Sequence, residues 1–178
     1  SAKRLSVSML RSLQDRGLEQ VALFVSDGLT GLPEAVTDIY PRAKHQACWT
    51  HLQRNAMHKV RTSDKGPVAD EHRRIYNLES REKAEECLAV FCKTWSGKYP
   101  KLADQFTGKS NLFSFFDFPA SIRKSLYTTN LAESLNKRLK RIVKSKEQFP
   151  NEDALERTVC TSYLEYNVKN EGRKHHGF

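Results

Sequence analysis

One short apolar run constrains the fold of this 178-residue chain more than any other stretch. Residues 21–25 read VALFV and are followed by Ser26. A run without a polar face is typical of a strand buried on both faces. Most other segments have helical periodicity, so we expect an α/β fold that is mostly helical. Open α/β sheets place their functional sites at the carboxyl ends of strands, and Asp27 lies at such an end.

The segments around this run alternate between helix and strand signals. Gly17 is placed to end a first helix, Pro33 stands at an early helical position, and Pro41 closes that second helix. In chain order, we expect a helix over about 5–17, the strand 21–26, a helix over about 32–40, a short strand over 43–48 and a helix over 49–61.

The middle of the chain has almost no strand signal. From about residue 68 to 108, apolar side chains recur at helical spacing, and we expect three helices there. Residues 111–119, NLFSFFDFP, are dense in aromatic residues. We expect these phenylalanines to lie in the core, with base stacking as the alternative.

A strongly basic helix is predicted to begin at Thr129 or Asn130, because either side chain can cap a helix. Its apolar residues, at positions 131, 135, 139 and 142, form one stripe. Glu133 lies in the first turn, among basic residues. The candidate DNA-binding residues on this helix are Asn136, Lys137, Arg138, Lys140, Arg141 and Lys144, and Arg54 joins them from the helix over 49–61. A final helix is expected after Asn151, with Leu155, Val159, Ser162 and Tyr166 on one side, and a tail from Gly172 on.

The charge balance favours a polyanionic partner. The chain has 30 Lys and Arg against 21 Asp and Glu, a formal net charge of +9. Because no long apolar segment is present, nucleic acid is favoured over a membrane. The four cysteines form no CxxC pair, which indicates a reducing, intracellular compartment, and we expect the cytoplasm.

Two acids could serve a phosphate-processing metal site. Asp27 and Glu133 are 106 positions apart, and sites that bind Mg²⁺ or Mn²⁺ need carboxylate oxygens that converge. Each acid also has a simpler interpretation. Asp27 before Gly28 is a common turn, and Glu133 is placed to pair with Lys137.

Three blocks of sequence make the interpretation specific. VSDGLTGLPEAV, CWTHLQRN and FFDFPASIRKSLYTTNLAESLNKRLKR, in that order, resemble the Mutator-type transposases, in particular their bacterial insertion-sequence branch. The resemblance covers about residues 16–141. It implies a catalytic domain of the RNase H-like fold with a DDE triad of acids, and an all-α insertion between the second and third acids. Asp27 would be the second acid and Glu133 the third, both metal ligands, while Cys48 and His51 would be the family's Cys-x-x-His motif.

The resemblance also implies a division of the chain. We expect a partial RNase H-like core over 1–61, the helical insertion over 62–118, and the rest of the core over 119–178. The family's first acid should lie upstream, and only 26 residues precede Asp27. We therefore expect a fragment of a longer transposase, which binds the catalytic Mg²⁺ or Mn²⁺ poorly and does not cut DNA alone. Missing strands would expose a sheet edge, which favours a homo-oligomer.

The same residues are also compatible with other functions. Cys48 and His51 could bind zinc with His45 or His58, although a single CxxH supports hydrogen bonding beside the active site better. A related RNase H-like nuclease would hydrolyse DNA without strand transfer. A non-catalytic helical DNA-binding module would gain nothing from a metal.

Overall fold

The computed structural model describes residues 2–145 and 148–173 and divides into two compact units. The N-terminal unit comprises Ser1–Thr129, and the C-terminal unit comprises Asn130–Phe178. Each unit is described by itself below. Within the described residues, none of the helices is both long and apolar enough to cross a membrane.

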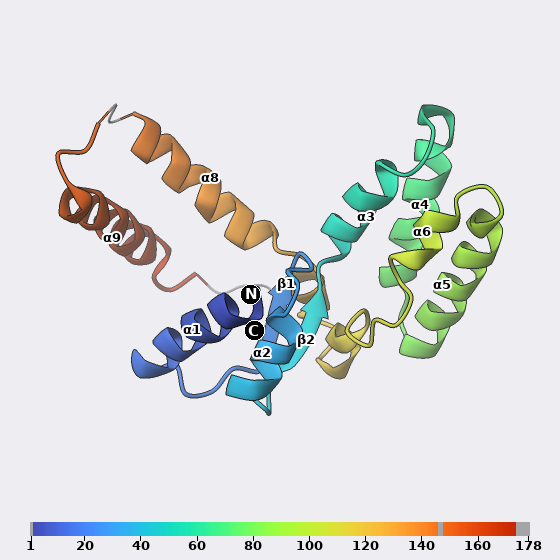
Figure 1. Cartoon of the computed structure of the whole chain (residues 1–178), viewed down its shortest axis with the longest axis horizontal. Helices are drawn as coiled ribbons and strands as arrows, with labels where there is room; N and C mark the ends of the chain where they lie inside the picture. Colours follow the sequence, from blue (N-terminus) through green and yellow to red (C-terminus); the bar gives the residue numbers. More distant parts are fainter. Residues whose placement is uncertain (1, 146–147, 174–178) are drawn as a thin grey trace. The chain divides into compact units, whose positions relative to one another are not determined.

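The N-terminal unit contains a small sheet and seven α-helices among its described residues (Figure 1). Two short 3₁₀ helices, Thr62–Asp64 and Ser114–Asp117, complete it. The elements in chain order are α1 (Ala2–Asp15), β1 (Leu23–Ser26), α2 (Leu32–Ile39), β2 (Lys44–Ala47), α3 (Trp49–Met57), α4 (Lys65–Tyr76), α5 (Arg81–Ser96), α6 (Pro100–Asp104) and α7 (Arg123–Leu126). The expected helix and strand order up to residue 61 is confirmed, and so are the three helices of the middle segment.

Strands β1 and β2 form a two-stranded parallel sheet in the described part of the chain. Leu23 pairs with Lys44 and Ser26 with Ala47. The expectation that the apolar run is buried on both faces was wrong, because Leu23–Val25 are only half-buried. The cause is the narrow sheet, since β2 pairs with one edge of β1 and nothing described pairs with the other.

Helices α1 and α2 pack against each other and form a small core beside the sheet. Leu10, Val36 and Tyr40 are buried there, and Phe24 of β1 contacts the Tyr40 ring at 5.4 Å between ring centroids. The Tyr40 hydroxyl donates to the carbonyl of Leu18 at 2.8 Å. These contacts attach β1 to the helices and so position the strand end that carries Asp27.

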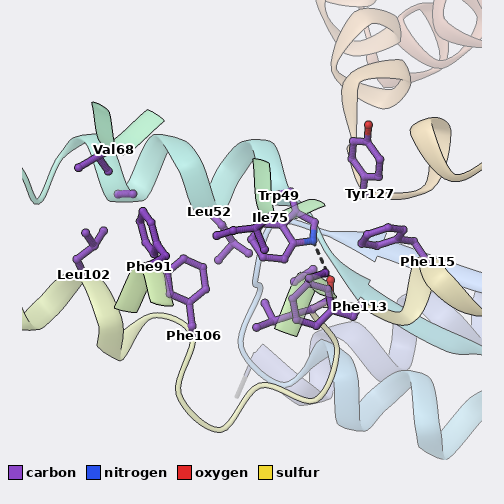
Figure 2. Close-up of a cluster of buried hydrophobic side chains, with 14 of the residues drawn as sticks. Trp49, Leu52, Val68, Ile75, Phe91, Leu102, Phe106, Phe113, Phe115 and Tyr127 are labelled. Carbon is purple, nitrogen blue, oxygen red and sulfur yellow. Dashed lines mark hydrogen bonds between the residues drawn. The ribbon is translucent and has the colours of Figure 1, made fainter. Parts of the chain in front are cut away.

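A second, larger core joins α3 to the helices of the middle segment. Figure 2 shows Trp49 among buried side chains from α3, α4, α5, α6 and the aromatic stretch after them. Trp49 is fully buried, and its indole N–H donates to the carbonyl of Leu112 at 2.8 Å, the bond drawn as a dashed line in Figure 2. The same stretch contacts β2, because the amide of Ala47 donates to the carbonyl of Asn111 at 2.9 Å. The middle segment therefore shares its core with the segment that precedes it.

The aromatic stretch lies in this core, as expected. Phe113 and Phe115 are buried, while Phe116 and Phe118 are half-buried. The burial of these rings supports packing rather than base stacking. One polar residue is also enclosed: His72 is fully buried, with its ring 5.3 Å from that of Trp49.

The C-terminal unit is a pair of packed helices, α8 (Asn130–Lys144) and α9 (Glu152–Asn170) (Figure 1). The Asn151 side chain caps α9 by accepting from the amide of Ala154 at 2.9 Å, as the sequence predicts. Ser162 and Tyr166, two residues of the expected α9 stripe, line a small cavity with the apolar residues of α8. Leu155 lies on the same side of α9 by helical spacing, but it is in the first turn and is 37% exposed. Most of the expected C-terminal tail, residues 174–178, lies outside the described residues.

Candidate functional site

Asp27 follows the last residue of β1 and is exposed, as its place after the apolar run predicts. The loop after it needs glycine at two places. Gly28 has φ of 97° and Gly31 has φ of 81°, in the left-handed region that other residues rarely adopt. A Cβ atom on Gly31 would also lie 2.8 Å from the backbone of Lys3 in α1. The loop therefore approaches α1 closely, and this fixes the path of the chain after Asp27.

The Cys-x-x-His residues lie at the start of α3. Cys48 is 1% exposed and forms the N-cap position, and its amide donates to the carbonyl of Ser26 at 2.7 Å. The Nδ1 atom of His51 is 3.2 Å from the Cys48 sulfur, and Arg54 Nη1 is 3.2 Å from His51 Nε2. These residues thus form one hydrogen-bonded group, attached through Cys48 to the residue that precedes Asp27.

Thr129 belongs to the same group, although 78 positions separate it from His51. Its hydroxyl is 3.5 Å from the Cys48 sulfur and 3.4 Å from His51 Nδ1. The backbone is attached nearby as well, because the amide of Trp49 donates to the carbonyl of Tyr127 at 2.9 Å. The sequence analysis proposed Thr129 only as a helix cap, and no local pattern reveals this contact.

A second histidine connects the end of β1 to the aromatic stretch. Asn111 Nδ2 donates to His45 Nδ1 at 2.7 Å, so the other ring nitrogen carries the proton and donates to Ser26 Oγ at 2.8 Å. Burial lowers the pKa of His45, although the charge of Glu34 opposes this shift. The neutral imidazole fits this bonding pattern, in which both ring nitrogens are occupied by protein groups. His45 is therefore engaged away from Cys48.

A cavity of about 690 Å³ lies beside the loop that follows Asp27. Gly28 and Gly31 line it on the side of the loop, and Lys109 and Asn111 line it from the other side. Asp117 bridges two cations at its edge: Lys44 donates to one carboxylate oxygen, and Arg81 donates to the other at 2.7 Å. The hydrogen bond from Lys44, with the charge of Arg81, lowers the pKa of Asp117. The cavity edge thus has positive charges held in fixed positions.

The C-terminal unit carries the basic helix. Asn136, Lys137, Arg138, Lys140, Arg141 and Lys144 are all exposed on α8, as predicted, and Glu133 is half-buried in its first turn. At 3.6 residues per turn, Glu133 lies on the same face as Lys137, Lys140 and Lys144. Arg138 lies beside the apolar stripe instead, with its guanidinium 5.6 Å from the centre of the Tyr166 ring. One face of α8 therefore combines an acid with exposed cations.

The structure brings some of the predicted site residues into contact, while the proximity of others remains a prediction. Within the N-terminal unit, His51 contacts both Cys48 and Arg54. Asp27 and Glu133 belong to different units, so their convergence stays a prediction. Among the described residues, no group of three or more His, Cys, Asp or Glu side chains is placed to hold a metal ion, and His45 does not complete a zinc site with Cys48 and His51. The carboxylates of Asp27 and Glu133 are hard oxygen donors of the kind that Mg²⁺ and Mn²⁺ prefer.

Comparison with known proteins decides the family. The profile described as "Transposase, Mutator family" matches residues 3–170, which is nearly the whole chain. The chain belongs to the Mutator family of transposases. The match includes Asp27, the Cys-x-x-His residues and Glu133.

Several relatives are named as insertion-sequence transposases. The chain is 42% identical to the transposase for insertion sequence element IS905 of Lactococcus lactis subsp. lactis (strain IL1403) over 171 residues, 96% of this chain and 44% of that protein. It is 35% identical to the transposase for IS1201 of Lactobacillus helveticus over 159 residues, 89% of this chain and 43% of that protein. The transposase for IS406 of Burkholderia multivorans (strain ATCC 17616 / 249) is 37% identical over 158 residues, 88% of this chain and 41% of that protein. The chain thus spans less than half the length of these relatives.

Proposed function

We propose that this chain is the catalytic-core segment of a DDE transposase that cuts DNA at the ends of an insertion sequence and joins those ends to target DNA. The observation that carries the proposal is the α8 face, where Glu133 precedes a row of exposed cations in a chain of the Mutator family. Binding and cleaving a DNA backbone requires both features, because cations neutralise the phosphates while carboxylates hold catalytic metals. An RNase H-like arrangement of the core is part of this proposal.

In this mechanism, Asp27 and Glu133 would hold Mg²⁺ or Mn²⁺. A bound divalent metal would supply charge neutralisation at the phosphodiester and lower the pKa of the attacking water. Lys137, Lys140, Arg141 and Lys144 would bind the backbone phosphates and align the strand. Positioning and electrostatic stabilisation would lower the barrier, so no protein nucleophile is required.

The same reasoning gives roles to the remaining residues. Cys48 and His51 would act by hydrogen bonding beside the site, because their side chains already contact each other and His51 also contacts Arg54. Arg54 and Asn136 are exposed and would contribute further contacts to DNA. Arg138 would contribute less than its neighbours on α8, since its guanidinium stacks on Tyr166.

We also propose that the 178-residue chain alone does not cut DNA and that the active protein is a homo-oligomer. The relatives are more than twice as long as the aligned region, and two carboxylates are few for a two-metal site. An unpaired strand edge invites pairing with another chain, and β1 has such an edge within the described residues.

A titration with Mn²⁺ tests the shared metal site in the chain itself. Paramagnetic Mn²⁺ at millimolar concentration should broaden the amide NMR signals near Asp27 and near Glu133 over the same concentration range. Asp27→Asn should abolish the broadening at both places, whereas Asp38→Asn, on the exposed side of α2, should leave both unchanged. Broadening at one acid only, or at both acids independently of Asp27, would contradict a shared site.

The activity is tested in the full-length transposase. Asp27→Asn and Glu133→Gln should each abolish strand cleavage and strand transfer, while DNA binding persists. A protein that cleaves but never transfers strands would be a nuclease instead. Retained transfer in either variant would overturn the proposed roles of the two acids.

A further inference from the structure

We propose that Thr129, Cys48 and His51 form a latch that fixes the point from which α8 leaves the N-terminal unit, and so positions Glu133. The latch is defined by the three side chains that meet at the start of α3. This inference rests on the proposed function, in which Glu133 is a metal ligand. It adds Thr129 as a positioning residue, which acts on the reaction through another group.

The contacts come from distant parts of the sequence. The Thr129 hydroxyl lies 3.5 Å from the Cys48 sulfur and 3.4 Å from His51 Nδ1, and the sulfur and Nδ1 are themselves 3.2 Å apart. Cys48 is 1% exposed, so water competes little for its sulfur. Three polar atoms that meet in a closed triangle beside a buried group restrict one another's rotamers.

The contact from Arg54 determines which ring nitrogen of His51 donates a hydrogen bond to the latch. A guanidinium can only donate, so the 3.2 Å contact from Arg54 makes His51 Nε2 an acceptor. Nδ1 is then the ring nitrogen that donates, and it is directed at Cys48 and Thr129. The Nδ1–H can donate to the Cys48 sulfur or to the Thr129 oxygen, and the Thr129 hydroxyl can donate to the sulfur or accept from the thiol.

The backbone supports the same geometry. The amide of Cys48 donates to the carbonyl of Ser26, and the amide of Trp49 donates to the carbonyl of Tyr127. Two successive residues of one chain segment therefore hold both the end of β1 and the segment that precedes α8. Asp27 follows the first of these anchored positions directly.

The short stretch of chain between Thr129 and Glu133 explains how the latch can position Glu133. Glu133 follows Thr129 by four residues, a stretch that spans at most roughly 14 Å even when fully extended. Catalytic carboxylates must be held to within roughly half an ångström by supporting residues. Anchoring Thr129 removes freedom at the covalent junction between the N-terminal unit and α8, and this is the role we assign to the Cys-x-x-His residues.

Hydrogen exchange in the 178-residue chain tests the latch without DNA or metal. Thr129→Val keeps the shape and removes the hydroxyl, so amide exchange over residues 127–134 should become faster by roughly three- to tenfold, the value of one hydrogen bond. Thr129→Ser should restore the slow exchange. Thr128→Val is the matched control and should leave it unchanged. Equal exchange in Thr129→Val and Thr128→Val would overturn the latch.

A second measurement applies even where exchange in this segment is too fast to follow. Alkylation of Cys48, followed by peptide mass spectrometry, should be several-fold faster in Thr129→Val than in the parent chain, while alkylation of Cys160 stays constant. Unchanged Cys48 reactivity in a folded Thr129→Val chain would contradict the contact.

The catalytic consequence is measured in the full-length transposase. Thr129→Val should lower kcat for strand cleavage at unchanged Kd for DNA, and Thr129→Ser should recover most of it. Normal kcat in Thr129→Val would remove the positioning role. The exchange result stands or falls independently of the Asp27 and Glu133 variants, so failure of the latch and failure of the proposed function can be distinguished.

Discussion

The two units differ in what holds them together. The N-terminal unit encloses a core of aromatic and aliphatic side chains around Trp49. In the C-terminal unit, none of the side chains whose burial is described is fully buried, and α8 exposes its cations. Two helices with little enclosed surface are marginal by themselves. The difference indicates that stability comes mainly from the first unit, while the second exposes the charge that the proposed DNA binding requires.

Among the predicted effects, removal of the Trp49 side chain should cause the largest change, a loss of stability in the N-terminal unit. Trp49→Ala should lower the free energy of unfolding of the N-terminal unit by about 3–5 kcal/mol, because it leaves a large cavity and removes one of the two hydrogen bonds that the carbonyl of Leu112 accepts, the other coming from Gln46 Nε2. Urea denaturation followed by far-UV circular dichroism measures it. Tyr166→Ala, in the C-terminal unit, is the matched aromatic truncation and should cost far less. Equal losses of unfolding free energy in the two variants would contradict the proposed difference in stability between the units.

His72 gives a smaller effect that depends on pH. Burial lowers the pKa of this histidine to about 4, from 6.5 when exposed. The unfolded chain therefore binds a proton first as the pH falls below 6.5, and the native state loses up to about 3 kcal/mol by pH 4. Denaturation series between pH 7.5 and 4 should show this loss.

Two variants isolate the contribution of His72. Within the described residues neither of its ring nitrogens has a hydrogen-bond partner, so His72→Leu should raise the free energy of unfolding at pH 7 by about 1–2 kcal/mol and flatten its pH dependence. His58→Gln, at an exposed position, should change neither quantity. An unaltered pH profile in His72→Leu would contradict the assignment.

The smallest effect concerns DNA affinity rather than stability. Replacing Lys137, Lys140 and Arg141 by Gln should weaken duplex binding by about tenfold at 0.1 M salt and reduce the slope of log K against log salt by roughly 2–3, because each phosphate contact releases counterions. Fluorescence anisotropy over a salt series measures both.

A charge-matched variant in the N-terminal unit provides the control. Lys83, Lys93 and Lys101 are exposed on α5 and α6, and their replacement by Gln removes the same net charge. The control should shift the affinity much less. Equal losses of DNA affinity in the two triple variants would mean that binding depends on net charge alone. The proposed functional difference between the two units would then be wrong.

Much of the architecture follows from local patterns that a single sequence contains. The VALFV run, the proline and glycine positions and the 3.6-residue stripes predict the elements, because hydrophobic periodicity and backbone restrictions act over a few residues. The same patterns indicated the exposed cations of α8. They overestimated the burial of β1, since burial depends on neighbours that periodicity does not specify.

The sequence by itself determined the family, the order of helices and strands, and the candidate acids. Only the tertiary structure decided that Thr129 meets Cys48 and His51, that His45 joins Ser26 to Asn111, and that His72 lies buried among aromatic rings. These are contacts between residues many positions apart, or enclosures made by several elements at once. Folding sets them through packing of the whole unit, and no spacing along the chain encodes them.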